Sequence, residues 1–415
     1  MITARLFPLE LHRLLQSRLT WLVIALSVLS LLAGLVLYKP ASAGTMLSVY
    51  LANPAIAGGA VSGILFGALT IYERSRSLQR RTAVLVSAVL SPLDLALAQM
   101  LALTAAAFLA LGLTMAAWLP VSIKLIGSVF DSFDYVLAYL IFMGLALPLA
   151  ILSAGAVCQF TGRADLSLVC FSAFAGLSLT VWADNWQLCW LNPCVWALSD
   201  DFSNLRIFRS AAYMRFTWLT ALTGIWAFSR LCIRQYGKGI LGSLARNMRR
   251  VYRPAAAALL LALSVTVGIA QPLVDHSNPD ETIASFLELP YLENVLCSGR
   301  SAQVFPNAAL GTVSGRASFQ FENTSGQQQT AAFGINPGYT VSSVQANGVG
   351  VPFSVSSYQE FNEAMLKVFL PAENEIELTV EYSGFPQEDR NSSSMQGRTE
   401  ISSEYLCLEN AALSP

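Results

Sequence analysis

The densest group of charged side chains in this chain comes directly after a long apolar stretch. Glu73 is followed within eight residues by four arginines: Arg74, Arg76, Arg80 and Arg81. One carboxylate among several guanidinium groups can form ion pairs, but it lacks the positioned acid and base that proton-transfer catalysis uses. This spacing therefore predicts contact with a partner or a surface rather than catalysis.

Patterns that carry catalysis are missing elsewhere in the sequence. The two histidines, His12 and His276, fall on opposite sides of the membrane predicted below, and no H-E-x-x-H zinc motif occurs. No nucleophile has a plausible histidine base. The G-x-x-x-x-G-K-[ST] pattern of a phosphate-binding loop is also absent. We therefore expect no enzyme activity, no catalytic or metal-binding residue and no cofactor in this chain.

The elements around the charged cluster are those of a multi-span membrane protein. Hydrophobic residues make up 54% and charged residues 12%, against about 25% charged in a soluble domain. Several uncharged runs are long enough to cross a bilayer. We predict seven spans, at 19–37, 49–71, 95–118, 135–157, 166–182, 213–229 and 254–273.

Charge and pattern change together after the last predicted span. Residues 1–274 hold 20 Lys and Arg against 9 Asp and Glu, whereas residues 275–415 hold 5 against 17. In the acidic part, segments such as EIELTVEYSG (375–384) alternate apolar and polar residues between Gly, Asn and Pro turns. We predict an antiparallel β-sandwich over 275–415.

Basic residues set the expected orientation, because short cytoplasmic loops are enriched in Lys and Arg. With the N-terminus inside, 15 basic residues fall inside and 5 outside, Arg215 being counted outside. The acidic domain then lies outside the cell. In an alternative, residues 1–43 are a cleaved signal peptide ending in Ala41-Ser42-Ala43, which leaves the later spans unchanged.

Ionisable residues are scarce at membrane depth. The first five predicted spans and the seventh contain no Asp, Glu, Lys, Arg or His. Ion-driven transporters usually need such groups to bind the driving ion. Any solute movement is therefore expected to draw its energy from a partner.

Small, aromatic and apolar residues predict how the spans pack. Glycines four residues apart favour close helix packing, within the subunit or at a dimer seam: Gly59, Gly63 and Gly67. Tryptophans in the loop 183–212 and just before it favour the membrane interface: Trp182, Trp186, Trp190 and Trp196. This loop is either a helical hairpin dipping into the outer leaflet or a surface loop with interfacial anchors.

Two further segments predict contact with membrane lipids. An apolar face over residues 1–18 suits an interfacial helix: Phe7, Leu11, Leu14 and Leu15. Residues 230–253 hold seven Lys and Arg and no acid, which favours anionic lipid over nucleic acid. Two cysteine pairs, Cys189 with Cys194 and Cys297 with Cys407, could oxidise outside the cell.

The segment after the charged cluster has an apolar helical face and ends at Ser91-Pro92. It is either a docking surface for a partner or a solvated anchor. Together, the charged cluster and this segment resemble the first cytoplasmic loop of permease subunits of type-2 ATP-binding-cassette (ABC) transporters. The residues that carry the resemblance are Glu73, Thr82, Leu85, Ser87, Leu90, Ser91 and Pro92. Residues 10–26 resemble the elbow helix of that family, and the tryptophan-rich loop resembles its outer hairpin. Arg81 replaces an expected glycine, and a seventh span exceeds the usual six.

The resemblance, over about 1–232, implies an architecture and a partner. The architecture is an elbow helix (1–18), a six-span permease domain (19–232), a basic cytoplasmic linker (233–253) and a seventh transmembrane helix (254–273). An exporter in the bacterial plasma (inner) membrane is implied, as a homodimer or as a heterodimer with a second permease. A separate cytoplasmic ABC ATPase would hold ATP and Mg²⁺ and drive the loop 73–94 through Glu73, Arg74, Arg76, Arg80, Arg81 and Leu85.

The acidic domain resembles the N-terminal β-sandwich of aminopeptidase N-type zinc metallopeptidases. The likeness rests on Val341, Val344, Asn347 and Gly348, on the strand 366–371, and on Tyr382 and Gly384. Peptidase activity does not carry over, because the zinc motif is missing. The chain would be a fragment of a permease–peptidase fusion, or a version that kept the sandwich alone. The alternative function is a membrane-anchored, peptidase-like receptor or scaffold that displays a non-catalytic β-sandwich outside the cell.

Overall fold

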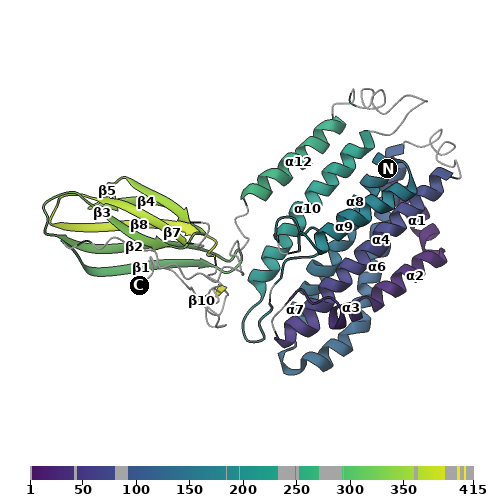
Figure 1. Ribbon diagram of the computed structural model, residues 1–415, viewed down its shortest axis with the longest axis horizontal. Helices are drawn as coiled ribbons and strands as arrows, with labels where there is room; N and C mark the ends of the chain where they lie inside the picture. Colours follow the sequence, from purple (N-terminus) through teal and green to yellow (C-terminus); the bar gives the residue numbers. More distant parts are fainter. Residues whose placement is uncertain are drawn as a thin grey trace. The chain divides into compact units, whose positions relative to one another are not determined.

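The computed structural model places most of the chain in two compact units, Met1–Gln271 and Pro272–Pro415. It describes residues 2–41, 44–79, 92–183, 185–195, 197–231, 248, 252–270, 292, 294–358, 363–387, 400–401 and 406–407. The first unit is helical and the second is built of β-strands (Figure 1).

The helical unit consists of long helices with short irregular connections. They are α1 (Ile2–Leu15), α2 (Arg18–Leu29), α3 (Leu31–Val36), the π-helix η1 (Ser48–Ala52), α4 (Asn53–Gln79), α6 (Pro92–Ile126), the 3₁₀-helix η2 (Gly127–Val129), α7 (Ser132–Ala138), the π-helix η3 (Tyr139–Gly144), α8 (Ala146–Thr161), α9 (Ala164–Leu179), α10 (Leu205–Leu231) and α12 (Tyr252–Ala270).

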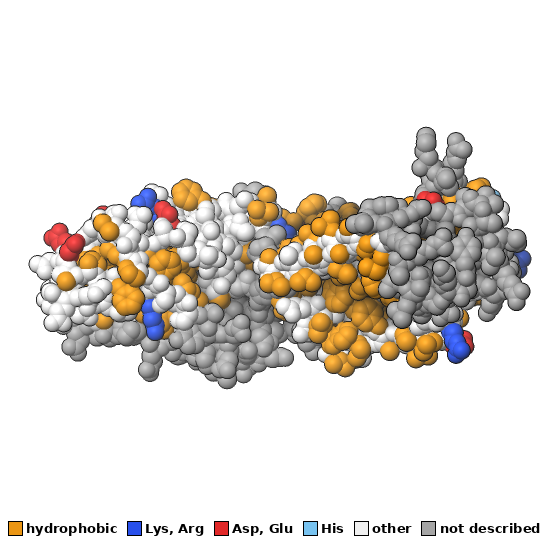
Figure 2. Space-filling model, turned by 90° about the horizontal axis from the view of Figure 1, so that it is seen from above, with side chains coloured by type: hydrophobic (Ala, Val, Ile, Leu, Met, Phe, Trp, Pro, Cys, Tyr) orange, Lys and Arg blue, Asp and Glu red, His pale blue; other side chains and the backbone are white. Residues whose placement is uncertain are grey.

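Four helical stretches are long and apolar enough to cross a membrane: Arg18–Val36, Ser48–Arg76, Asp94–Val129 and Ser132–Thr161. They coincide with the first four predicted spans. Two shorter apolar helices, Ala164–Leu179 and Pro254–Ala270, match the fifth and seventh. Hydrophobic side chains cover much of the described face of the helical unit (Figure 2). The prediction of a helical membrane region is confirmed, while the total of seven spans stays a prediction.

Local sequence explains several helix ends. Pro92 opens α6, where a missing N–H costs no helical hydrogen bond. Gly162 ends α8 in the left-handed conformation, at φ 66°, and its N–H bonds to the Cys158 carbonyl. The side chain of Asn53, at the start of α4, bonds the backbone N–H and the carbonyl of Ala41 at 2.8 and 3.0 Å. The approach to the second span is thus fixed by a buried amide.

Helix α4 lies at the centre of the unit and packs against α2, α3, α8 and α9. Its residues Ile56 and Phe66 are fully buried. Helix α1 packs along α6 through Leu14, which is 1% exposed, so the apolar face predicted for residues 1–18 contacts protein.

The second unit contains antiparallel sheets, which confirms an antiparallel β region after the helices. One sheet has the order β1-β2-β8-β4-β5 and another the order β3-β7-β6, while β9 and β10 pair with each other. The strands are β1 (Val295–Asn307), β2 (Thr312–Asn323), β3 (Gln329–Ile335), β4 (Tyr339–Ala346), β5 (Val349–Gly350), β6 (Phe353–Tyr358), β7 (Glu363–Leu370), β8 (Glu375–Gly384), β9 (Glu400–Ile401) and β10 (Leu406–Cys407).

Residues of the two larger sheets share one hydrophobic core. Phe319 of β2 and Phe333 of β3 meet with ring centroids 5.0 Å apart. The Asn347-Gly348 turn joins β4 to β5 with φ of 50° and 78°, as expected of an Asn-Gly hairpin. Alternating burial along β2 and β8 follows from the period-two pattern of the sequence.

Candidate functional site

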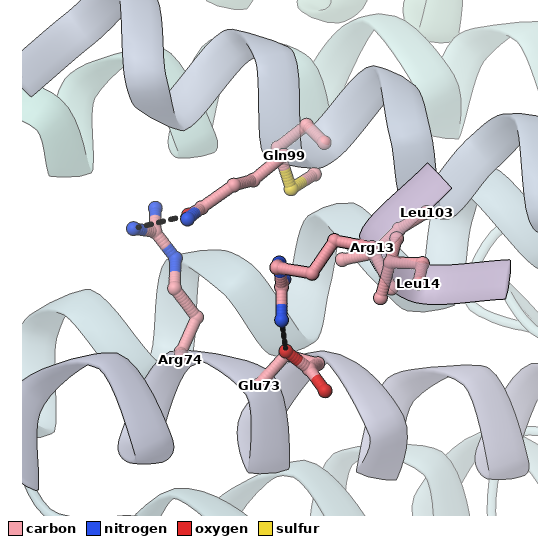
Figure 3. Close-up of a pocket in the computed structure, with 7 residues that line it drawn as sticks. Arg13, Leu14, Glu73, Arg74, Gln99 and Leu103 are labelled. Atoms are coloured by element: carbon pink, nitrogen blue, oxygen red, sulfur yellow. Dashed lines mark hydrogen bonds and ion pairs between the residues drawn. The ribbon is translucent and has the colours of Figure 1, made fainter. Parts of the chain in front are cut away.

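The charged cluster begins in the last turns of α4, where Glu73 is 8% exposed. Its carboxylate accepts from Arg13 of α1, with Arg13 Nη1 2.6 Å from Glu73 Oε2 (Figure 3). Arg76 Nη1 lies 3.8 Å from Glu73 Oε1. Arg13 also donates from Nε to Glu10 at 2.9 Å. A single buried carboxylate thus joins α1 to the end of α4.

The Arg13 guanidinium stays charged under physiological conditions. Burial alone would lower its pKa, but the bonds to Glu73 and Glu10 outweigh burial and raise the pKa above its ordinary value. The Arg13 side of the contact with Glu73 therefore keeps its positive charge.

A small hollow lies beside this ion pair, between α1, α4 and α6 (Figure 3). Arg74 of α4 reaches across it, with Nη1 3.4 Å from Oε1 of Gln99 on α6. Seven residues line the hollow: Arg13, Leu14, Glu73, Arg74, Gln99, Met100 and Leu103. Polar contacts therefore join the end of α4 to both α1 and α6.

The predicted coupling residues fall into two groups. The structure brings Glu73, Arg74 and Arg76 together on the last turns of α4. Arg80, Arg81 and Leu85 lie outside the described residues. Sequence reasoning missed Arg13, which was placed away from the apolar face. The available signal was the Glu10–Arg13 spacing of three residues, which keeps both charges on one side of the helix.

The three glycines of α4 that were predicted to pack, Gly59, Gly63 and Gly67, all face other parts of the same unit. A Cβ added at Gly59 would lie 2.6 Å from the Phe142 carbonyl oxygen, and one at Gly63 would lie 2.9 Å from Leu191 Cδ1. One added at Gly67 would overlap the Phe171 ring. Small residues here let α4 approach η3, α9 and the 185–195 segment closely.

The tryptophans do not behave as one group. Trp182 and Trp186 are partly exposed, and Trp196 lies outside the described residues. Trp190 is fully buried, stacks on Phe174 at 4.6 Å and donates to the Phe174 carbonyl at 3.1 Å. Its indole has no exposed surface with which to reach lipid, so Trp190 packs the protein interior.

The prediction of a helical hairpin at 183–212 is wrong. The described residues from 180 to 204 form turns, bends and irregular backbone, and α10 begins at Leu205. Side-chain contacts hold this segment in place instead of helical hydrogen bonds. The Asp200 carboxylate accepts from the backbone N–H groups of Met46 and Leu47 at 2.8 and 2.9 Å. Asn204 donates to Asp134 at 2.8 Å.

Arg215 corrects a second expectation. The charge count assigned it to an outside loop, but it is 1% exposed within α10. Its Nη1 donates to the Trp190 carbonyl at 2.6 Å and its Nη2 to the Phe142 carbonyl at 3.1 Å. Phe142 belongs to the π-helix η3, a helix type often found at functional positions. The sixth predicted span therefore contains a buried cation that fixes the 185–195 segment to η3.

Arg230, at the other end of α10, is also buried. It was expected in a basic segment that contacts anionic lipid, but it is 6% exposed. Its Nη1 donates to Gln159 at 3.0 Å, and its guanidinium lies 4.8 Å from the Trp226 ring. Neutral acceptors and an aromatic face thus surround this cation.

Other chemistry is sparse in the part of the chain that the structure describes. No group of three or more His, Cys, Asp and Glu residues there could hold a metal ion. Cys189 and Cys194 are not joined by a disulfide. Comparison with protein-family models, with curated proteins and with solved structures found no match for this chain. Function is therefore argued from the geometry of the site.

Proposed function

We propose that this chain is the permease subunit of an ATP-driven ABC exporter in the bacterial plasma membrane. A separate cytoplasmic ATPase would supply the energy, and two permeases would pair as a homodimer or a heterodimer. The N-terminus would lie in the cytoplasm. Six spans would form the permease core, and a seventh would lead to an extracytoplasmic β-sandwich.

The Arg13–Glu73 ion pair is the observation that supports this proposal most directly. A driven permease needs a stiff connection between the surface that the ATPase pushes and the helices that move. The segment that resembles the coupling loop begins at Glu73, inside the last turns of α4, which continues to Gln79. At that point Glu73 holds α1, and Arg74 reaches Gln99 of α6.

The proposed mechanism follows from these contacts. Closure of the ATPases on ATP would displace the loop 73–94. Glu73 would pass that displacement to α1 through Arg13, and Arg74 would pass it to α6. The helices would then switch between inward-open and outward-open arrangements. No residue of this chain would take part in ATP chemistry.

Co-expression with a Walker-motif protein that is encoded next to the gene of this chain tests the proposal. We expect the wild-type chain to retain that ATPase through purification and to stimulate its ATP hydrolysis in lipid nanodiscs. Glu73→Arg should lower the stimulation at least fivefold, because three cations would then crowd one turn. The double variant Arg13→Glu with Glu73→Arg should restore part of it.

The control is Arg300→Gln, on the exposed strand β1, which should leave stimulation unchanged. Two results would refute the proposal. One is a chain that never retains an ATPase. The other is full stimulation by a variant in which Glu73, Arg74 and Arg76 are all reversed in charge.

A second candidate function is favoured by the compactness of the β unit, which has its own hydrophobic core. In this candidate the helices only anchor a peptidase-like receptor or scaffold. The receptor or scaffold would be favoured over the exporter if a zinc peptidase encoded by an adjacent gene co-purified with the chain and no ATPase did.

A further inference from the structure

The two larger sheets of the β unit differ in width, and one edge of the wider sheet projects beyond the narrower one. The wider sheet has the order β1-β2-β8-β4-β5 and the narrower sheet the order β3-β7-β6. Only residues 351–352 join β5 to β6, so these two outer strands lie at the same side of the unit. At the other side, Phe333 of β3 meets Phe319 and Phe321 of β2, with ring centroids 5.0 and 6.2 Å apart. Strand β3 therefore lies over β2, and β1 extends one strand further (Figure 1).

The projecting strand β1 turns part of its core-side face to solvent. Three of its residues stand opposite buried residues of β2 and therefore point to the core side: Arg300, Ala302 and Val304. Arg300 is exposed, and Ala302 and Val304 are only partly buried. No described strand of the narrower sheet lies over them. We call this strip of β1, together with the neighbouring edge of β3, the β1 ledge.

Strand β3 forms the wall of the β1 ledge, and its outer edge is open. Among the described strands, β3 pairs with β7 alone. Its sequence, QTAAFGI, has no charge and no proline, the features that usually protect an exposed edge. Strand β1, by contrast, has the core-side Arg300, Pro306 near its end and a bulge between Cys297 and Gly299, which all hinder pairing. An incoming strand would therefore add to β3 and lie across β1.

The opposite edge of the narrower sheet has no comparable ledge. Phe353 and Val355 of β6 stand opposite buried residues of β7 and are 36% and 44% exposed. At this side the wider sheet ends in β5, which is two residues long. A strand added to β6 would therefore have almost no floor to pack on. The edge of β3 is the better acceptor of the two.

We propose that the β1 ledge binds an extended segment of a second protein, which adds to β3 as a further strand of the narrower sheet. Main-chain hydrogen bonds along the seven residues of β3 would hold the segment. Its alternate side chains would pack on Ala302 and Val304 and are therefore apolar. Arg300 is the single charged residue of β1 and β3, so the segment also carries a carboxylate that reaches Arg300.

Charge argues against a second copy of this chain as the occupant. Residues 275–415 hold 5 Lys and Arg against 17 Asp and Glu, so two such units repel each other. The long edge strand that a second copy offers is β1, which would bring another guanidinium to the ledge instead of a carboxylate. The site is independent of the transport function proposed above, in which Arg300→Gln serves as a control.

Binding of short peptides to the full chain, purified in a neutral maltoside detergent, tests this site. The probe is a fluorescein-labelled peptide as long as β3, in which valine alternates with threonine and one valine is replaced by glutamate. Fluorescence anisotropy measures its dissociation constant, and we expect saturable binding. The same peptide with N-methylated backbone amides should bind at least tenfold more weakly, because it cannot donate to β3. A peptide with lysine in place of glutamate should bind about fivefold more weakly, as expected for one exposed ion pair.

A matched pair of variants on neighbouring residues of β1 locates the site. Ala302→Glu places a carboxylate beneath the bound peptide and should weaken binding about tenfold. Ser301→Glu, on the opposite face of β1, should leave binding unchanged. Arg300→Gln should abolish the preference for the glutamate peptide over the lysine peptide.

Hydrogen–deuterium exchange of the wild-type chain gives a second measurement that needs no variant. The glutamate peptide should slow amide exchange in β3, because the outer N–H groups of that strand would become hydrogen-bonded. Exchange in β6, the other outer strand of the same sheet, should not change and serves as the internal control.

Several results would overturn the proposal. Absence of saturable binding, or equal binding of the N-methylated peptide, would exclude strand addition. Equal binding by wild-type protein and Ala302→Glu would place the peptide elsewhere, as would slowed exchange in β6 instead of β3. Dimers of the chain that the peptide dissociates would mean that a second copy occupies the ledge.

Discussion

Breaking the Arg13–Glu73 ion pair should destabilise the helical unit measurably. Glu73 has 6% of its side chain exposed and Arg13 has 44%, with 2.6 Å between their nearest atoms. Exposed pairs contribute at most about 1 kcal/mol, whereas removing one partner of a buried pair costs about 3–5 kcal/mol. This half-buried pair lies between those limits, so Glu73→Gln should cost about 2 kcal/mol.

A double-mutant cycle isolates the pair from its neighbours. The four proteins are wild type, Arg13→Gln, Glu73→Gln and the double variant, and we expect a coupling energy of about 1–2 kcal/mol. All eight tryptophans lie between residues 21 and 226, so tryptophan fluorescence during denaturation reports on the helical unit alone. Glu10→Gln is the control, because it removes the other carboxylate that Arg13 contacts and leaves the Arg13–Glu73 pair in place. A coupling below about 0.3 kcal/mol would refute a mechanical link through this pair.

Three further predictions concern other parts of the molecule. Gly59→Ala should cost about 1–3 kcal/mol, because the new methyl would press on the backbone of η3; Gly176→Ala, with open space around it, should be neutral or stabilising in the same fluorescence measurement. Arg215→Met should leave two carbonyls without their charged donor and speed proteolysis within 185–195, whereas Lys124→Gln should not. Burial raises the pKa of Tyr382 above its ordinary value, so its neutral form stabilises the β unit below about pH 10 and this contribution is lost as the pH rises further; Tyr382→Phe should remove from the tyrosinate absorbance one tyrosine that titrates above the ordinary range.

Much of the architecture could be predicted because it depends on composition and period. Uncharged runs of sufficient length located the four membrane-capable helices. Period-two alternation located strands such as β8, and Asn347-Gly348 located a hairpin. These signals are local. A membrane-spanning helix forms its backbone hydrogen bonds within itself, and a strand forms them with the adjacent strand.

The site itself was less accessible to sequence reasoning. Glu73 and Arg74 were identified, but their partners Arg13 and Gln99 lie far away in sequence and on other helices. Arg215 was assigned to a loop because charge counting treats every arginine near a span end as solvated. Its burial depends on two backbone carbonyls supplied by distant segments. Trp190 was misjudged for a similar reason, because its stacking on Phe174 is a tertiary contact.

The π-helix η3 shifts the angular positions of the side chains around the axis of the fourth membrane-capable helix. Each wide turn holds about one residue more than an α-helical turn, which offsets the faces before and after it by roughly 100°. A helical wheel drawn through Ser132–Thr161 as one ideal helix would therefore assign residues beyond Gly144 to the wrong side. Cysteine-scanning or cross-linking maps of this helix should be plotted in two separate registers, one for α7 and one for α8.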